Sequence, residues 1–111
     1  MRDEIKTEEG IARFGGKRDR YFMFLKKFAG GLADSMPAFA DAMSDEQKDA
    51  TAHTVHDMKG MAGNLGATSL YNAAVEFEKT QRAGAPDEGL YAELDECIKA
   101  TKAKILNTEW V

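Results

Sequence analysis

Two histidines lie three residues apart in the stretch Ala52–Gly66, and the second has neighbours that suit chemistry on its imidazole ring. Lys59 and Gly60 follow His56 by three and four residues, so in a helix all of them lie on one surface. A lysine at this place favours a negatively charged group on the ring, because its ammonium offsets that charge. These are the parts that a phosphorylated imidazole needs, namely a ring nitrogen that attacks phosphorus and a cation beside it.

Gly60 and Gly63 lie on the same stripe of this expected helix as the histidine. Alanine favours a helix over glycine by roughly 1 kcal/mol, so helix formation does not explain glycine at these positions. We interpret the two glycines as room for a large partner to approach the imidazole closely. His56 also follows Val55, an expected core residue, by one position, which places the ring at the edge of the buried stripe.

The pattern of apolar residues predicts helices around this stretch. The chain contains 17 Ala but only three Val and four Ile, a composition that favours helices over strands. We expect a short helix over Thr7–Phe14 that Thr7 caps. The next segment, Lys17 to Met43, fits one bent helix or two shorter ones, and we favour one bent helix. The remaining expected helices run from a Ser44 capping box to Leu65, from a Thr68 cap to Gly84, and from Pro86 to Asn107. Short turns join them, so we expect an all-α fold, an antiparallel four-helix bundle with a short additional N-terminal helix.

Composition excludes several classes of protein. The chain has 111 residues, and we expect residues 1–111 to form a single domain. The net charge of -4 argues mildly against nucleic acid or an anionic membrane surface as the main partner. No apolar run is long enough to cross a membrane. The single cysteine, Cys97, suits a reducing compartment, so we expect a cytoplasmic protein. No glycine-rich phosphate-binding motif occurs, which argues against ATP as a direct ligand.

The segment around the second histidine resembles the signature of histidine-containing phosphotransfer (HPt) domains of multistep phosphorelays. The motifs that carry the resemblance are HDMKG at residues 56–60 and AGNLG at residues 62–66. GIARFGG at 10–16 and RYFMFLKKFA at 20–29 resemble the first two helices of the family, and LYNAAVEFEKTQRAG at 70–84 resembles the helix after the phosphohistidine. The resemblance covers nearly the whole chain.

The resemblance implies that His56 is the phosphoacceptor, that Lys59 stabilises the phosphoryl group and that Gly60 leaves room for a receiver domain. We accordingly expect Asp57, Gly60 and Gly63 to contact the partner. The partners would be receiver domains of response regulators or of a hybrid sensor histidine kinase. The receiver would supply Mg²⁺, so we expect no cofactor on this chain, and we expect a monomer. Both a free-standing protein and a piece of a hybrid sensor kinase fit the sequence.

In this family a polar side chain on the following helix often binds the histidine ring, and hairpin geometry locates that side chain here. The turn lies near residue 66 or 67, so residue 56 faces roughly residue 77 or 78 in an antiparallel pair. Phe77 is apolar and belongs to the expected core. We therefore expect Glu78 to accept a hydrogen bond from one ring nitrogen of His56, which leaves the other nitrogen as the nucleophile.

Two other classes of function use the same residues. A helical module could bind a receiver or another signalling partner without being phosphorylated. His53 and Asp57 complete an H-x-x-H-D pattern that suggests a metal site, but it offers only three ligands, all from one helix, so we expect no metal. An ATP-dependent kinase would need a nucleotide-binding domain. We therefore expect a phosphoryl carrier without kinase activity of its own.

Overall fold

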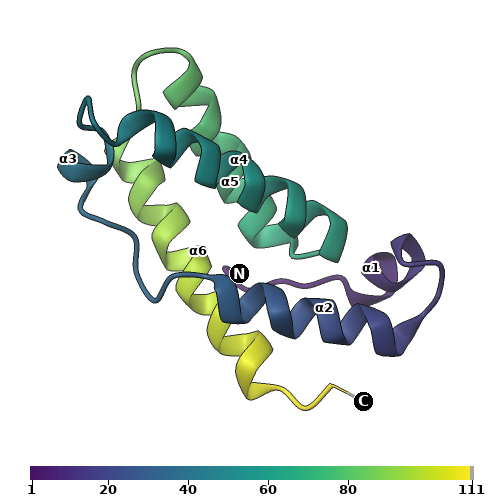
Figure 1. Ribbon diagram of the computed structural model, residues 1–111. Coiled ribbons are helices and arrows are strands. Elements are labelled where there is room, and N and C mark those ends of the chain that lie inside the picture. The colour runs from purple at the N-terminus through teal and green to yellow at the C-terminus, as the bar shows by residue number, and fades with distance from the viewer. Residues whose placement is uncertain (111) are drawn as a thin grey trace.

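Six helices make up the computed structural model, which describes residues 1–110 (Figure 1). They are α1 (Thr7–Arg13), α2 (Arg18–Gly31), α3 (Phe39–Ala42), α4 (Lys48–Leu65), α5 (Thr68–Arg82) and α6 (Glu88–Asn107). No strand occurs in this part of the chain, so the expected all-α fold is confirmed. The four long helices are α2, α4, α5 and α6, and α1 is the short additional helix near the N-terminus.

The hairpin of α4 and α5 is the part of the fold that positions the functional residues. The two helices lie side by side in opposite directions, α6 packs against α5, and α2 packs against α6 (Figure 1). Gly66 ends α4 with a φ of 77°, in the left-handed region that favours glycine. The Gly66 carbonyl also accepts a hydrogen bond from the Lys6 backbone N–H at 2.8 Å, which ties the N-terminal segment to the turn.

The expected single helix from Lys17 to Met43 is wrong, because α2 ends at Gly31 and only the short α3 follows. Consecutive glycines weaken a helix, and a proline disfavours helical backbone in the residue before it. Side chains of α6 then hold the connecting segment in place. The Asp95 carboxylate accepts a hydrogen bond from the Met36 backbone N–H at 2.8 Å, and the Tyr91 hydroxyl donates to the Pro37 carbonyl at 2.7 Å.

The expected helix starts also need correction. Thr7 and Thr68 are not caps, because each is the first residue inside its helix. Ser44 forms no capping box, because its hydroxyl donates to a backbone carbonyl three residues earlier, at 2.8 Å. Pro86 precedes α6, and the true cap is Asp87, whose carboxylate accepts a backbone N–H of the first turn at 2.8 Å. Of these helix starts, only that of α6 has a side-chain cap, and the N-caps of α1, α4 and α5 make no side-chain hydrogen bond.

The buried core fixes the rotation of each long helix about its axis. The largest fully buried side chains are Tyr21, Phe77, Leu25, Leu65, Leu70, Leu94, Ile98, Ile105, Val55 and Thr101. On α4 the expected stripe is present, since Val55, Ala62 and Leu65 are buried and Met58 is half-buried. With this stripe facing inward, the residue after Val55 lies at the edge of the core. That residue is His56.

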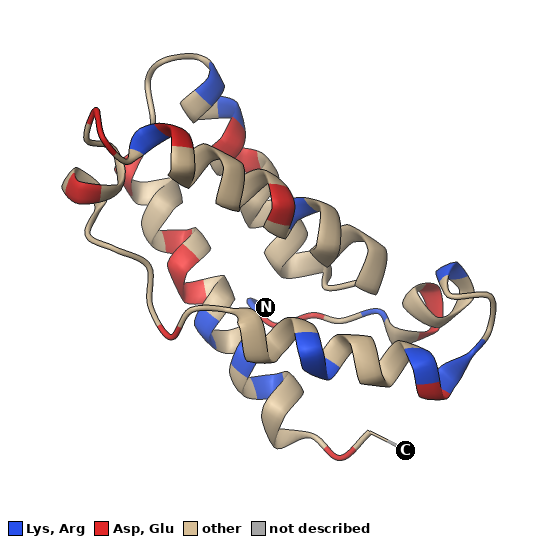
Figure 2. Ribbon diagram, in the orientation of Figure 1, with Lys and Arg blue, Asp and Glu red and all other residues tan. Residues whose placement is uncertain are grey.

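Charged side chains are graded along α6, with acidic residues in its first half and basic residues in its second half (Figure 2). This order suits the helix dipole, which favours negative charge near the N-terminus and positive charge near the C-terminus. Glu93 in the first half forms an ion pair with Arg2 at 2.9 Å. The N-terminal segment is thereby attached to α6 as well as to the turn after α4.

Helix α1 packs closely on the end of α4 at Gly10. A Cβ at this position would overlap the ring of Tyr21 and would lie 2.6 Å from the Leu65 carbonyl oxygen. The Tyr21 hydroxyl donates to the same Leu65 carbonyl at 2.6 Å. Burial raises the pKa of Tyr21 to about 12, so this hydroxyl keeps its proton and remains a donor.

Gly10→Ala should destabilise the fold by about 1–3 kcal/mol, because the added methyl group has no space beside a backbone oxygen. Gly30→Ala in α2 is the matched control, since a Cβ there meets nothing within 4 Å. It should be neutral or stabilising by up to about 1 kcal/mol. Urea unfolding followed by circular dichroism measures both variants. Equal unfolding midpoints would contradict the close packing of α1 on α4.

Candidate functional site

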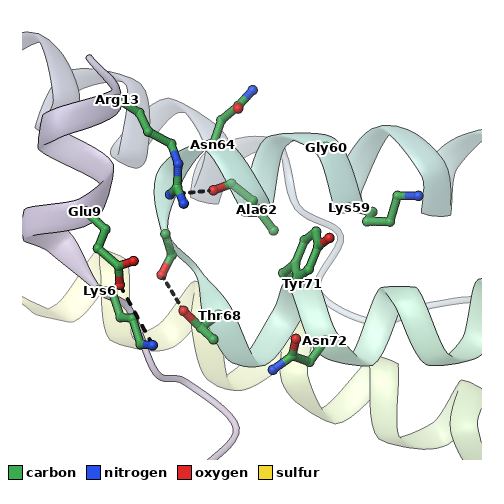
Figure 3. A pocket seen from close by; sticks show the side chains of 12 residues that line it. Lys6, Glu9, Arg13, Lys59, Gly60, Ala62, Asn64, Thr68, Tyr71 and Asn72 are labelled. Carbon is green, nitrogen blue, oxygen red and sulfur yellow. Dashed lines mark hydrogen bonds and ion pairs between the residues drawn. The ribbon is translucent and has the colours of Figure 1, made fainter. Parts of the chain in front are cut away.

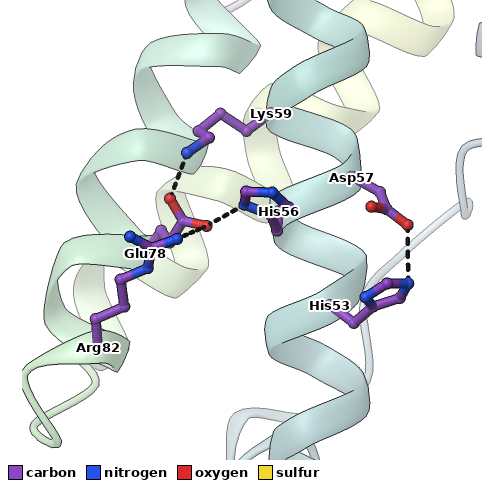
Figure 4. A network of polar contacts seen from close by, with 6 residues as sticks. All are labelled: His53, His56, Asp57, Lys59, Glu78 and Arg82. Carbon is purple, nitrogen blue, oxygen red and sulfur yellow. Dashed lines mark hydrogen bonds and ion pairs between the residues drawn. The ribbon is translucent and has the colours of Figure 1, made fainter.

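His56 lies on the surface of α4 and faces α5. Its side chain is 55% exposed, and its Nδ1 lies 3.0 Å from Oε2 of Glu78 on α5 (Figure 4). The hydrogen bond predicted from the hairpin geometry is therefore present in the structure. Its two partners come from helices that run in opposite directions, so the α4–α5 turn sets their register.

The Glu78 carboxylate is almost buried, and cationic side chains surround it. Lys59 donates to Oε1 at 2.7 Å, and Arg82 donates to Oε2 at 3.5 Å (Figure 4). Burial by itself raises the pKa of Glu78, but the hydrogen bonds from Lys59 and His56 and the positive charges of Lys59 and Arg82 outweigh burial. The pKa is lowered from its ordinary value of 4.5. The carboxylate is therefore ionised at neutral pH.

An ionised carboxylate has no proton to donate, and this determines the form of the histidine ring. Because Glu78 only accepts, a neutral His56 must carry its hydrogen on Nδ1 to make the bond. The lone pair then resides on Nε2. The arrangement thus fixes one nitrogen of a half-exposed ring and leaves the lone pair on the other nitrogen.

Lys59 does not stand free beside the ring in this structure. Its ammonium contacts Glu78 at 2.7 Å, the shortest ion pair at the site, and its side chain is only 23% exposed. The family resemblance implies a different contact, with a phosphoryl group on His56, and that role stays a prediction. In the structure Lys59 compensates the charge of the carboxylate that holds the histidine.

His53 and Asp57 form a separate pair on the exposed side of α4. Asp57 Oδ2 lies 3.2 Å from His53 Nε2, and both side chains are well exposed (Figure 4). Within residues 1–110, no cluster of three or more His, Cys, Asp and Glu side chains has the arrangement to hold a metal ion. The assignment of Asp57 to the partner surface stays a prediction.

Two clefts flank the site. One, of about 710 Å³, is lined by His53, His56, Glu78 and Arg82 together with the segments before α4 and after α5. The other, of about 500 Å³, is lined by Lys59, Gly60, Gly63 and Tyr71 together with α1 (Figure 3). The site therefore lies between two concave surfaces, each of which offers space for a partner.

The two glycines of the expected partner surface have different surroundings. A Cβ on Gly63 would lie 3.2 Å from the Tyr71 ring, so packing within the chain already favours glycine there. A Cβ on Gly60 would meet nothing within 4 Å. Nothing inside the fold therefore requires glycine at position 60, and the expectation that a partner requires it stays a prediction.

Arg82 is the site residue that the sequence reasoning missed. It follows Glu78 by four residues on α5, the spacing at which oppositely charged side chains meet on a helix. That spacing was the available signal. Arg82 is 69% exposed, so its contact with the carboxylate is much weaker than that of Lys59.

Comparison with protein families identifies the class to which this helical chain belongs. The sequence model described as "Hpt domain" matches residues 23–104 of the 111-residue chain. The chain therefore belongs to the Hpt domain family. Comparison with curated proteins and with solved structures gave no match.

Membership of this family supports a histidine phosphotransfer role in a phosphorelay in general, and Hpt domains generally interact with receiver domains of two-component systems. None of the helices in residues 1–110 combines the length and the hydrophobicity needed to cross a membrane.

The stability of the fold should depend on pH through Glu78. Because folding lowers the pKa of Glu78, its contribution is fully present above the ordinary value of 4.5 and is lost as the pH falls through the folded value. Glu78→Gln should remove this dependence and cost about 1–3 kcal/mol at neutral pH. Urea unfolding at several pH values from neutral to about pH 3 measures the free energy of unfolding of both proteins.

Glu76→Gln is the matched control for this measurement. It makes the same change on the same helix, where the side chain is 54% exposed and pairs with the neighbouring Lys79 in a contact of 3.1 Å. This variant should follow the wild-type pH profile. Parallel profiles for wild type and Glu78→Gln would contradict the assigned role of the buried carboxylate.

Proposed function

We propose that this chain is a histidine phosphotransfer protein that carries a phosphoryl group on His56 between the aspartates of receiver domains. The hydrogen bond between Nδ1 and Glu78 supports this proposal most, because it makes Nε2 the nucleophilic atom of a half-exposed ring. Family membership supports the class of reaction.

The reaction follows from this ring geometry. The Nε2 lone pair attacks the phosphorus of an aspartyl phosphate, the P–O bond to the aspartate breaks, and its electron pair stays on the aspartate carboxylate. The P–N bond that forms is labile, so the group passes on to another aspartate by the reverse chemistry. The receiver supplies Mg²⁺ and its acidic residues, and this chain supplies the oriented imidazole. The chain is thus a carrier without ATP-dependent kinase activity.

The partner surface surrounds the ring on α4. The receiver aspartate must come within bonding distance of Nε2, so the receiver has to pack against the helix surface beside His56. Gly60 gives it a flat approach, since no side chain projects there. Asp57, one position after the histidine, is exposed and would lie at the edge of this contact. Receivers of response regulators and of a hybrid sensor kinase are the proposed partners.

Treatment with a small phosphoramidate should add one phosphoryl group to the wild-type chain and none to His56→Gln. Intact mass measures the gain, and loss of the group in acid but not in base identifies a phosphohistidine. His53→Gln is the control and should be labelled like wild type, because its ring is outside the Glu78 network. Equal labelling of wild type and His56→Gln would overturn the site assignment.

If no variant is labelled, a phosphorylated receiver replaces the small donor. Absence of labelling with this second donor would favour the other class of function, a helical module that binds a receiver without being phosphorylated. In that case His56→Gln would also bind the partner and function like wild type.

Gly60→Gln separates docking from chemistry. The new side chain has space within the chain, so folding and labelling by phosphoramidate should be unchanged. Transfer to or from a receiver should slow by about 10-fold or more, because even a displacement of about 1 Å at a reacting centre can cost 10²-fold. Gly30→Gln is the control, since a side chain there also has open space but lies on α2. Equal transfer rates for both variants would argue against docking over Gly60.

A further inference from the structure

If His56 is phosphorylated as proposed, the proton on its other ring nitrogen must either stay or leave when the P–N bond forms. The inference below rests on that proposed function. In the free chain, Nδ1 of His56 carries a hydrogen and Nε2 carries the lone pair. When that lone pair bonds to phosphorus, the ring holds a hydrogen on one nitrogen and phosphorus on the other. The ring is then a cation, unless Nδ1 releases its proton.

Glu78 is the group against which this proton lies, at an Nδ1–Oε2 distance of 3.0 Å. Lys59 from α4 and Arg82 from α5 also contact this carboxylate and stabilise its ionised form. A carboxylate with a lowered pKa does not take the proton from the ring. The other charged or titratable side chains that line the adjoining cleft are Asp45, Lys48, Asp49 and His53.

We infer that phosphorylated His56 keeps its Nδ1 proton at neutral pH and is held as an imidazolium ion paired with the Glu78 carboxylate. Glu78 is a positioning residue in this reaction, since it acts through the ring and does not touch phosphorus. An ionised acceptor holds the Nδ1 proton more firmly than a neutral one would, because hydrogen bonds to ionised groups are roughly twice as strong as those between neutral groups.

The two oxygens of Glu78 make this charge arrangement possible. Lys59 contacts Oε1, whereas His56 contacts Oε2. Lys59 can therefore turn toward the phosphoryl oxygens without breaking the bond that holds the ring. The carboxylate then pairs with the imidazolium of His56 in place of the ammonium of Lys59. The nearly buried carboxylate keeps a cationic partner in both states.

The retained proton sets the reactivity of the phosphorylated chain. When phosphorus is transferred to the next aspartate, the P–N bond breaks and its electron pair returns to Nε2. The ring then leaves as a neutral imidazole, with its hydrogen still on Nδ1. A neutral leaving group departs more readily than an imidazolate anion, so both transfer and hydrolysis are fast at neutral pH.

Nitrogen NMR of the full chain, phosphorylated with phosphoramidate, tests the inference directly. At pH values from neutral to mildly basic, Nδ1 of wild type should show the chemical shift of a protonated nitrogen. In Glu78→Gln it should show that of an unprotonated nitrogen. Hydrolysis of the P–N bond in this pH range should be about tenfold slower in Glu78→Gln than in wild type. Glu76→Gln, with the same change at an exposed position of α5, should match wild type in both measurements.

An unprotonated Nδ1 in phosphorylated wild type would overturn the inference while leaving the proposed function intact. Equal hydrolysis rates for wild type and Glu78→Gln would likewise overturn the inference and leave the proposed function intact. Labelling that persists in His56→Gln would overturn the proposed function, and the inference with it. The wild-type spectrum alone locates the proton, so the test holds even if Glu78→Gln does not fold.

Discussion

A negative charge that is almost buried has to be compensated, and in this chain that charge is the Glu78 carboxylate. Its residue is 8% exposed, and cations from both helices of the hairpin reach it. Removing such a charge from water is costly unless it is paired and hydrogen-bonded. The need for compensation therefore fixes Lys59 and the His56 ring against α5. The positions of the side chains at the site therefore follow from the charge of one residue.

That carboxylate meets its partners only because the hairpin has one register. Gly66 ends α4 in a backbone conformation that other residues rarely adopt, so the turn falls at a fixed place. Burial of Val55 on one side of α4 and of Phe77 on α5 then sets the rotation of each helix. Packing and turn geometry together place the residue after Val55 opposite the residue after Phe77. The functional contact is thus a consequence of the core.

Local patterns in the sequence predicted the hairpin, because its signals lie within a few residues of one another. The helical period, the glycine stop and the spacing across the turn were enough to pair His56 with Glu78. For the end of α2 the local signals, two glycines and a later proline, fitted a bend as well as a stop. The contacts that hold the segment after α2 come from Asp95 and Tyr91 of the distant α6, and no local pattern reveals them. The contact of Lys59 was missed because it depends on how deeply the carboxylate is buried.

The attachment of the N-terminal segment bears on where the folding unit begins. The family match starts at residue 23, yet residues before it supply Ile11, Tyr21 and Phe22 to the core. Arg2 and Lys6 add contacts to α6 and to the α4–α5 turn. A fragment cut at the match would leave the inner faces of α2 and α4 open to water. The matched segment is therefore shorter than the part of this chain that builds the core.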